Sequence, residues 1–305
     1  MAATETSAST GPGIGAVGRV IVTGVKGGLG SATAARLRGR GVQVIGIDVI
    51  GDEQAIACDI TDDAAVSRAV AEAVQRLGGL DAVVHFAGIG TPNDAGASLV
   101  PDALRVIDVN LLGAWRVTAA ALPALLDGRA TRGGRKGRVV FVASELAYLA
   151  LPFVSAYSVA KRGMTAYADA LRLEYGTDLH VTTVCPGYVR TPIHDAGRRV
   201  GLALEGQVRR EEVEDVVATV LRALTAARPR RETACTRGGA AELWVARHLP
   251  GLVGSAVARR IRRRAAAGHF DASPVAAGLV RRLTRANVPA TSTDTTAPVI
   301  ERSAS

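Results

Sequence analysis

Short apolar runs alternate with longer segments of helical periodicity over the first two-thirds of the chain. Each run is rich in β-branched residues and short enough to be a buried parallel strand. The runs are Val20–Thr23, Val42–Asp48, Ala82–Phe86, Val139–Ala143 and Val181–Val184, and Glu232–Thr236 is a candidate last strand. Helical patterns occupy residues 30–40, 62–77, 99–127, 155–176 and 211–227. The alternation predicts an α/β fold, a doubly wound parallel sheet with helices on both faces.

The pattern changes after Gly238. Leu252, Val257 and Ile261 fall on one side of a helical stretch, and five arginines between residues 259 and 264 crowd the rest. We therefore predict a domain at 18–237 and a basic amphipathic helical extension at 238–286. The ends of the chain are rich in small and polar residues, so we expect a disordered leader at 1–17 and a disordered tail at 287–305.

Composition points to a globular cytoplasmic protein. The chain has 305 residues, of which 48% are hydrophobic, and this excludes a disordered class. Its three cysteines show no C-x-x-C spacing, so they suggest neither a disulfide framework nor a zinc site, and we expect no bound metal. The leader has no basic and apolar segments of a signal peptide, and we expect no run of the roughly 18 uncharged apolar residues that a membrane span needs.

The net charge of +9 lies entirely in the last third of the chain. Residues 1–197 contain 18 basic and 18 acidic side chains, whereas 198–305 contain 19 and 10. Three interpretations compete for the arginine-rich segment 240–285. It is a helical cover over the substrate cleft or a subunit contact, a peripheral contact with an anionic membrane, or a nucleic-acid surface. We expect no nucleic acid, because aromatic residues are few and no binding motif is present.

A glycine-rich loop directly follows the first predicted strand and precedes a helix. Its sequence, Thr23-Gly24-Val25-Lys26-Gly27-Gly28-Leu29-Gly30, lets the backbone approach a pyrophosphate at a helix N-terminus, although a plain tight turn would use glycine too. Asp48 ends the second strand, 18 residues beyond Gly30. A carboxylate there accepts from the ribose hydroxyls and repels a 2′-phosphate, so Asp48 favours NAD over NADP. The alternative is that Asp48 only forms a turn at the end of the strand. Lys26 in the glycine loop argues for NADP instead, because a basic group there would contact an adenosine phosphate.

Tyr157 and Lys161 are four residues apart in a predicted helix, so both side chains lie on one face. An ammonium close to the phenol favours its ionised form and lets it exchange protons near neutral pH. Of the 37 Lys and Arg residues only three, at 26, 136 and 161, are lysines, which argues against an ordinary solvated face. Ser144 lies thirteen residues before Tyr157. We expect His85 to be a packed core histidine and assign no role to Glu145, which strand alternation turns away from Ser144.

In this order and at these separations, the motifs resemble the short-chain dehydrogenase/reductase family over about residues 18–237. Thr23, Gly24, Gly28 and Gly30 match its Thr-Gly-x-x-x-Gly-x-Gly element, and Pro186-Gly187 matches its Pro-Gly turn. Phe86-Ala87-Gly88 meets the family's Asn-Ala-Gly element only in part, so a polar bracing role of the asparagine is lost or moved.

The resemblance implies a Rossmann-type fold and a role for each matched residue. Ser144 binds the substrate oxygen, Tyr157 exchanges its proton during hydride transfer, and Lys161 holds the nicotinamide ribose while lowering the Tyr157 pKa. Asn110 holds a water near the lysine, which completes the implied catalytic set. The implied cofactor contacts are Gly24, Lys26, Gly28, Leu29, Gly30, Asp48, Asp59 (at the adenine), Ile60, Ala87, Gly88, Tyr157, Lys161, Pro186, Gly187, Val189 and Thr191 (at the nicotinamide amide).

The resulting hypothesis is an oxidoreductase that transfers a hydride between NAD(H) and a secondary alcohol or ketone. An apolar cover or a membrane-facing entrance would suit a steroid- or lipid-like substrate. Two alternatives stay open, namely an NAD-dependent epimerase or dehydratase of the same superfamily and a non-catalytic NAD-binding regulatory protein. The resemblance also implies a homo-oligomer, a dimer or tetramer, built through the helices at 99–127 and 155–176.

Overall fold

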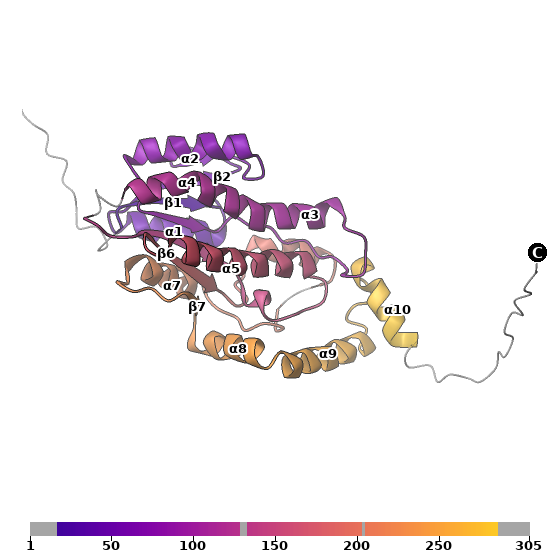
Figure 1. Cartoon of the computed structure of the whole chain (residues 1–305). Helices are drawn as coiled ribbons and strands as arrows, with labels where there is room; N and C mark the ends of the chain where they lie inside the picture. The colour runs from indigo at the N-terminus through magenta and orange to yellow at the C-terminus, as the bar shows by residue number, and fades with distance from the viewer. Residues whose placement is uncertain (1–16, 129–132, 203–204, 286–305) are drawn as a thin grey trace, which may run out of the picture.

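The computed structural model describes residues 17–128, 133–202 and 205–285. Its centre is a seven-stranded, fully parallel sheet in the order β3-β2-β1-β4-β5-β6-β7 (Figure 1). The strands are β1 (Arg19–Thr23), β2 (Gln43–Asp48), β3 (Ala55–Ala57), β4 (Ala82–His85), β5 (Gly137–Val142), β6 (Leu179–Cys185) and β7 (Glu232–Ala234). The predicted fold class is confirmed. The sequence analysis missed β3, which has only three residues and therefore no readable period.

Helices cover both faces of the sheet because side chains alternate along each strand. Val20 and Val22 of β1 pack in one core with α1 (Gly28–Arg38) and α7 (Val213–Thr225). Ile21 points the other way, into a core with residues of three further helices. These are α2 (Asp63–Leu77), α4 (Ala114–Asp127) and α5 (Ser155–Tyr175).

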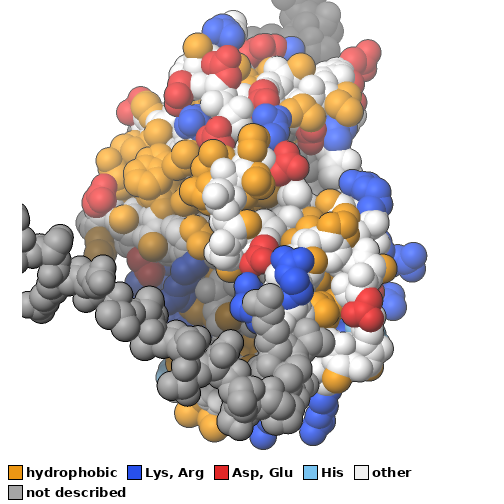
Figure 2. Space-filling model, turned by 90° about the vertical axis from the view of Figure 1, so that its right-hand side faces the viewer, with side chains coloured by type: hydrophobic (Ala, Val, Ile, Leu, Met, Phe, Trp, Pro, Cys, Tyr) orange, Lys and Arg blue, Asp and Glu red, His pale blue; other side chains and the backbone are white. Residues whose placement is uncertain are grey.

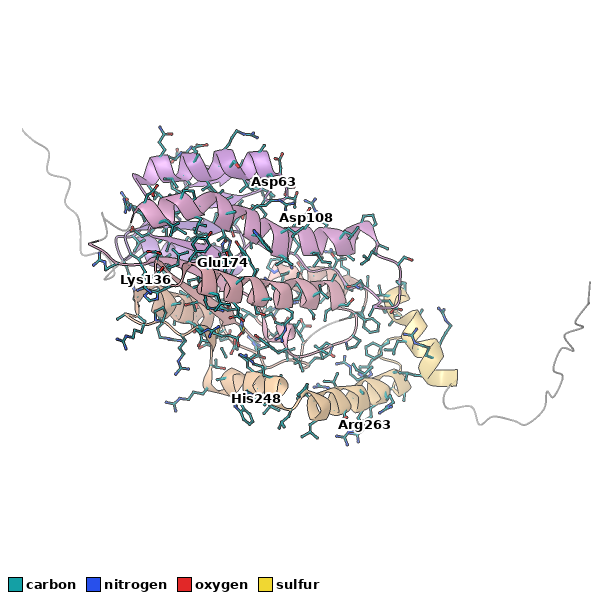
Figure 3. The ribbon with its side chains drawn as sticks, viewed as in Figure 1. Asp63, Asp108, Lys136, Glu174, His248 and Arg263 are labelled. Carbon is teal, nitrogen blue, oxygen red and sulfur yellow. The ribbon has the colours of Figure 1, made fainter. Side chains whose placement is uncertain are left out.

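The predicted helix at 99–127 is divided into three parts. The α-helices α3 (Pro101–Ile107) and α4 flank a π-helical turn, η1 (Asp108–Gly113). The Arg116 guanidinium donates to Asp108 (2.7 Å) and to Asp63 of α2 (3.0 Å), which ties this turn to the neighbouring helix (Figure 3 labels both aspartates).

By length and composition, the stretch Pro101–Asp127 is the one candidate membrane span among the described residues, with a mean hydropathy of 1.4. The sequence analysis expected no such run. Val106, Val117 and Leu125 on its inner face are completely buried in the domain core. Packing within the domain therefore explains the apolar residues of this inner face.

The C-terminal segment forms helices, as its periodicity predicts. They are α8 (Arg237–His248), α9 (Pro250–Ala266), a 3-10 turn η4 (Pro274–Ala276) and α10 (Ala277–Arg285). In Figure 1, α8 and α9 follow each other along one edge of the molecule, and α10 lies beyond the end of α9. The predicted tail and residues 1–16 of the predicted leader lie outside the described residues, and Val17 is buried.

Candidate active site

A cavity of about 550 Å³ opens at the carboxyl ends of the central strands. The chain turns back in strand order between β1 and β4, and ligands of open α/β sheets bind at such a point. Of the predicted site residues, those that line the cavity are Gly24, Gly28, Leu29, Gly30, Gly88, Ser144, Tyr157, Lys161, Pro186, Gly187, Val189 and Thr191. Lys26, Asp48, Asp59, Ile60, Ala87 and Asn110 lie outside its lining.

The glycine loop forms one wall through its backbone. Gly24 has φ of 68°, and a Cβ on it would lie 2.5 Å from the Ala87 nitrogen. A Cβ on Gly30 would lie 2.1 Å from the Gly24 carbonyl oxygen. The first turn of α1 faces the cavity, where its free amide groups favour an anion. This close backbone approach at a helix N-terminus fits the pyrophosphate of a dinucleotide.

Asp48 lies at the end of β2 beside this loop. Its Oδ2 accepts from the Lys26 backbone amide at 2.9 Å. The Lys26 ammonium forms an ion pair with Asp52, and this hydrogen bond is the main cause that lowers the Asp52 pKa. The sequence analysis missed Asp52, which no motif distinguishes. The Asp52 carboxylate thus neutralises Lys26, the basic group that argued for a 2′-phosphate.

Asp59 and Ile60 follow β3. The Asp59 carboxylate accepts from the Thr61 amide (3.0 Å) and hydroxyl (2.8 Å) and pairs with Arg105 (3.3 Å), and the Thr61 amide is the main cause of its lowered pKa. Ile60 is buried, where a Cβ on Gly113 would meet its side chain at 2.6 Å. Both residues therefore have structural contacts of their own at this end of the sheet.

Tyr157, Lys161 and Ser144 meet on one wall of the cavity. Helix α5 carries Tyr157 and Lys161 on the same face, with the Lys161 Nζ 5.5 Å from the centre of the Tyr157 ring. Ser144 is the second residue after β5, and its Oγ accepts from the Leu146 amide at 3.1 Å. The Ser144 hydroxyl is then able to donate to the Tyr157 oxygen, and this side-chain hydrogen bond acts to lower the Tyr157 pKa.

The predicted depression of the Tyr157 pKa by Lys161 is not found. Burial raises the pKa of Tyr157 to about 12 and outweighs the Ser144 hydrogen bond. Burial also lowers the pKa of Lys161 to about 8. The Lys161 ammonium donates to the Val142 carbonyl oxygen at 2.9 Å. Loss of hydration therefore dominates for both groups, since each charged form is removed from water.

Asn110 lies in the π-helical turn and is completely buried. Its Oδ1 accepts from the Ile89 amide at 2.7 Å, and its Nδ2 donates to the Ile89 carbonyl at 2.9 Å. One side chain thus satisfies both backbone groups of a residue that lines the cavity. The amide fixes the loop after β4, and π turns are frequent at functional sites.

Phe86 stands where an asparagine was expected, and it lines the cavity. The polar bracing of its loop comes from other residues. The Thr23 hydroxyl accepts from the Ala87 amide at 3.2 Å, and Asn110 holds Ile89. The bracing role has moved to side chains on β1 and η1.

His85 is a core residue, as expected. Its ring stacks on Phe141 with centroids 4.8 Å apart, and its Nε2 lies 2.9 Å from the Thr118 hydroxyl. Burial, helped by Lys161, lowers its pKa to about 3. An imidazole with so low a pKa, packed in the core and outside the cavity lining, is too weak a base to take the substrate proton.

A pair of buried carboxyl groups, Glu145 and Glu211, lies behind Ser144. Both residues are 2% exposed, and one Cβ on Gly239 would lie within 2.8 Å of an oxygen of each. Glu211 accepts from the Gly187 amide (2.9 Å) and the Thr236 hydroxyl (2.7 Å), while neither Glu145 oxygen has a partner in the described part of the chain. The pKa of Glu145 is raised to about 8, mainly by burial and secondly by the charge of Glu211. Glu145 begins the 3-10 turn η2 (Glu145–Ala147), so strand alternation does not apply to it, and no pattern in the sequence indicates its neighbour Glu211.

Apolar side chains form the wall opposite the glycine loop. Phe153, Leu202 and Phe270 line the cavity and share one cluster with Ile261 of α9. The rings of Phe153 and Phe270 meet edge to face at 5.8 Å, and Phe153 holds a φ of 66°, rare for a bulky residue. Phe270 comes from the C-terminal extension. That segment therefore contributes to the cavity wall, as the cover interpretation predicts.

Comparison with known proteins gives consistent matches. A sequence model described as short chain dehydrogenase matches residues 18–199. The 1-deoxy-11-beta-hydroxypentalenate dehydrogenase of Streptomyces avermitilis is 33% identical over 191 residues, which cover 57% of this chain and 69% of that protein. Dehydrogenase/reductase SDR family member 7B of Danio rerio is 28% identical over 194 residues, which cover 56% of this chain and 61% of that relative, less than two thirds of its length.

A solved structure agrees with these matches. The short chain dehydrogenase from Mycobacterium paratuberculosis, bound to NAD, superposes with a TM-score of 0.61 at 26% identity and covers 69% of this chain and 92% of its own. The range matched by the family extends over more than half of the chain and contains the glycine loop, Ser144, Tyr157 and Lys161. The chain therefore belongs to the short-chain dehydrogenase family of oxidoreductases.

Proposed function

We propose that this protein oxidises an apolar secondary alcohol with NAD, or reduces the corresponding ketone with NADH, using Tyr157 as acid and base. The observation that carries the proposal is the meeting of Ser144, Tyr157 and Lys161 on one wall of a cavity, between the glycine loop and an apolar wall. A regulatory protein would not need these side chains, whereas an epimerase or dehydratase would use the same Tyr157 and Lys161 and is distinguished by net formation of NADH.

The glycine loop, Asp48 and the Pro186–Gly187 turn would hold the dinucleotide. A bound nicotinamide supplies the hydride acceptor or donor for the reaction. Asp48 favours NAD because its carboxylate accepts from ribose hydroxyls, and Lys26 is already paired with Asp52. The NAD-bound relative from Mycobacterium paratuberculosis supports the same choice.

Ser144 and Tyr157 would handle the substrate oxygen. The Ser144 Oγ accepts from Leu146, which leaves its proton to donate to the substrate. Tyr157 removes or returns the hydroxyl proton, and the Lys161 ammonium on the same face of α5 would hold the nicotinamide ribose. The pKa of Lys161, about 8, keeps this ammonium protonated at neutral pH.

The apolar wall supports an apolar substrate. Phe153, Leu202 and Phe270 offer carbon surface, and a cavity of about 550 Å³ has the size of ordinary small-molecule sites. The Streptomyces relative, named for a hydroxypentalenate, is consistent with a hydroxylated substrate.

The test is Tyr157→Phe, with NADH formation followed across a panel of apolar secondary alcohols. Loss of the transferable proton should lower kcat about 10³-fold, within the usual range for general acid–base catalysis, while the Kd for NAD stays within about twofold. Tyr175→Phe, at the other end of α5 and outside the cavity lining, is the matched control and should keep full activity. The KM for NAD should be lower than that for NADP.

Wild-type turnover in Tyr157→Phe would disprove the proton-transfer role. Isomerised product without net NADH would instead identify the epimerase. Equal or reversed preference between NAD and NADP would overturn the argument from Asp48.

We also propose a homo-oligomer that pairs through the outer face of α3, α4 and α5. Large exposed apolar side chains gather there, namely Leu99, Val100, Leu104, Leu112, Trp115 and Val159. Figure 2 shows hydrophobic side chains collected on the part of the surface that carries α3. Such a patch marks an interface, and a second copy supplies a matching face through two-fold symmetry. Light scattering on the intact chain should give at least twice the 31.4 kDa of one chain; a monomer would contradict this proposal.

A further inference from the structure

The outer edge formed by α8 and α9 is strongly basic. Residues 238–285 contain nine arginines and two acidic residues, Glu242 and Asp271. Glu242 is bound by Arg209 of the domain at 2.9 Å, so its charge is already compensated. Arg259, Arg262 and Arg263 are exposed, and within the described residues their guanidinium groups have no hydrogen bond or ion pair. Their positive charge is therefore available to a partner outside the chain.

The helical register places these arginines away from the domain. Val257 and Ile261 of α9 pack inward on the cluster that contains Phe270. The sequence analysis wrongly placed Leu252 on that side, because nine residues separate it from Ile261 and turn it to the opposite face. Leu252 instead shares the outer face with Arg259 and Arg263, at spacings of seven and four residues. In Figure 3 the labelled His248 of α8 and Arg263 of α9 both lie on the outer side of these helices, away from the sheet. The two helices thus present one continuous edge.

Large apolar side chains are exposed on the same edge where the helices join. Trp244, Leu249 and Leu252 are 56%, 41% and 67% exposed. The Trp244 ring stacks on His248, with centroids 4.6 Å apart, and still leaves much of its surface uncovered. Exposed apolar groups this close together indicate a binding surface when charged groups surround them.

We propose that the α8–α9 edge docks on an anionic lipid bilayer. Trp244, Leu249 and Leu252 enter the interfacial region, and Arg259, Arg262 and Arg263 lie against the headgroup phosphates. A partner for this edge has to be apolar and anionic at once. A second copy of the edge would bring arginines against arginines, and a nucleic acid offers no apolar surface to the leucines, so the bilayer fits best.

Docking would bring the substrate cavity close to the lipid. The same segment packs Ile261 and Phe270 inward, and Phe270 lines the cavity. An apolar substrate dissolved in the membrane would then have a short path to the site. This consequence rests on the proposed function, whereas the docking surface itself does not.

The test is flotation of the full chain with vesicles of phosphatidylcholine mixed with phosphatidylserine, and with phosphatidylcholine alone. The protein should float with the anionic vesicles at low salt, and binding should fall as salt rises. Arg259→Glu/Arg263→Glu should weaken binding at least about tenfold, since each surface arginine contributes roughly 1 kcal/mol. The control, Arg36→Glu/Arg68→Glu, makes the same charge change on the exposed sides of α1 and α2 and should bind nearly as the wild type does.

Trp244→Ala/Leu252→Ala should also release the protein from anionic vesicles while keeping the salt dependence. Thermal melting verifies that each variant is folded, and NAD binding, which uses none of these residues, should not change. The proposal is overturned if the wild type fails to float with anionic vesicles, or floats equally with phosphatidylcholine alone. It is also overturned if Arg259→Glu/Arg263→Glu and the control Arg36→Glu/Arg68→Glu bind vesicles equally well. The same holds if the substitutions on α8 and α9 change only self-association of the protein.

Discussion

The two ends of the cavity are built from different parts of the chain. At the cofactor end the wall is backbone, since Gly24 packs so closely on Ala87 that a single methyl group would collide. At the substrate end the wall is made of the side chains of Phe153, Leu202 and Phe270, which come from three distant segments. Backbone contact leaves no freedom in residue size, whereas a side-chain wall can change its shape without moving a strand. The cofactor end is thus constrained by the fold, and the substrate end is open to variation.

Gly24→Ala, at the cofactor end, should have the largest effect of the substitutions that distinguish the two ends. The new Cβ would lie 2.5 Å from the Ala87 nitrogen at a φ of 68°, so the loop must shift. We expect the Kd for NAD to rise at least about tenfold and the free energy of unfolding to fall by about 2–4 kcal/mol, measured by NAD titration and urea denaturation. Gly41→Ala is the control, because Gly41 has a φ of 77° but nothing within 4 Å of its Cβ. Equal effects at both glycines would show that backbone strain, not close approach, restricts Gly24.

Phe270→Ala should affect the opposite end alone. Losing the ring removes apolar contact surface, so the KM for an apolar alcohol should rise about tenfold while the Kd for NAD is unchanged. The adjacent, exposed His269→Ala is the control and should leave both constants as they are. If NAD affinity fell as much as substrate affinity, the two ends would not be separable.

Glu145→Gln should have the smallest effect, on stability. The pKa of Glu145 is about 8 in the folded chain and ordinarily 4.5. Between these pH values the unfolded chain loses this proton while the folded chain keeps it, so wild-type stability falls as pH rises through this window and levels off above about 8. The variant should therefore be more stable than the wild type at pH 9, by at least about 1 kcal/mol, but not at pH 4.

Urea denaturation at both pH values measures this difference. Glu174→Gln, on the exposed side of α5, is the control and should show no such pH dependence (Figure 3). A loss of stability at pH 9 in Glu145→Gln would mean that the ionised carboxylate has a favourable partner and would contradict this prediction.

Local patterns in the sequence were sufficient for six of the seven strands and for the meeting of the glycine loop, Ser144, Tyr157 and Lys161 in the cavity, but not for β3 or the apolar wall. Continuous apolar runs such as Val20-Ile21-Val22 predict buried strands, and the spacing of Tyr157 and Lys161 predicts their common face. The pairing of Lys26 with Asp52, the buried couple of Glu145 with Glu211, and the raised pKa of Tyr157 could not be predicted. Each depends on which distant groups the fold brings together and how much water it removes, and no short-range pattern records either quantity.

The π-helical turn at Asp108–Gly113 has a consequence for how this chain tolerates changes in length. A π turn contains one residue more than the α-helix needs, so deleting a residue there would restore an ordinary helix and leave Val117 and Leu125 facing the sheet. The same deletion inside α4 would rotate everything after it by about 100°. The deletion at the turn would break the hydrogen bonds between Asn110 and Ile89 but keep the packing of α4. The extra residue is retained for the site, and the scaffold does not require it.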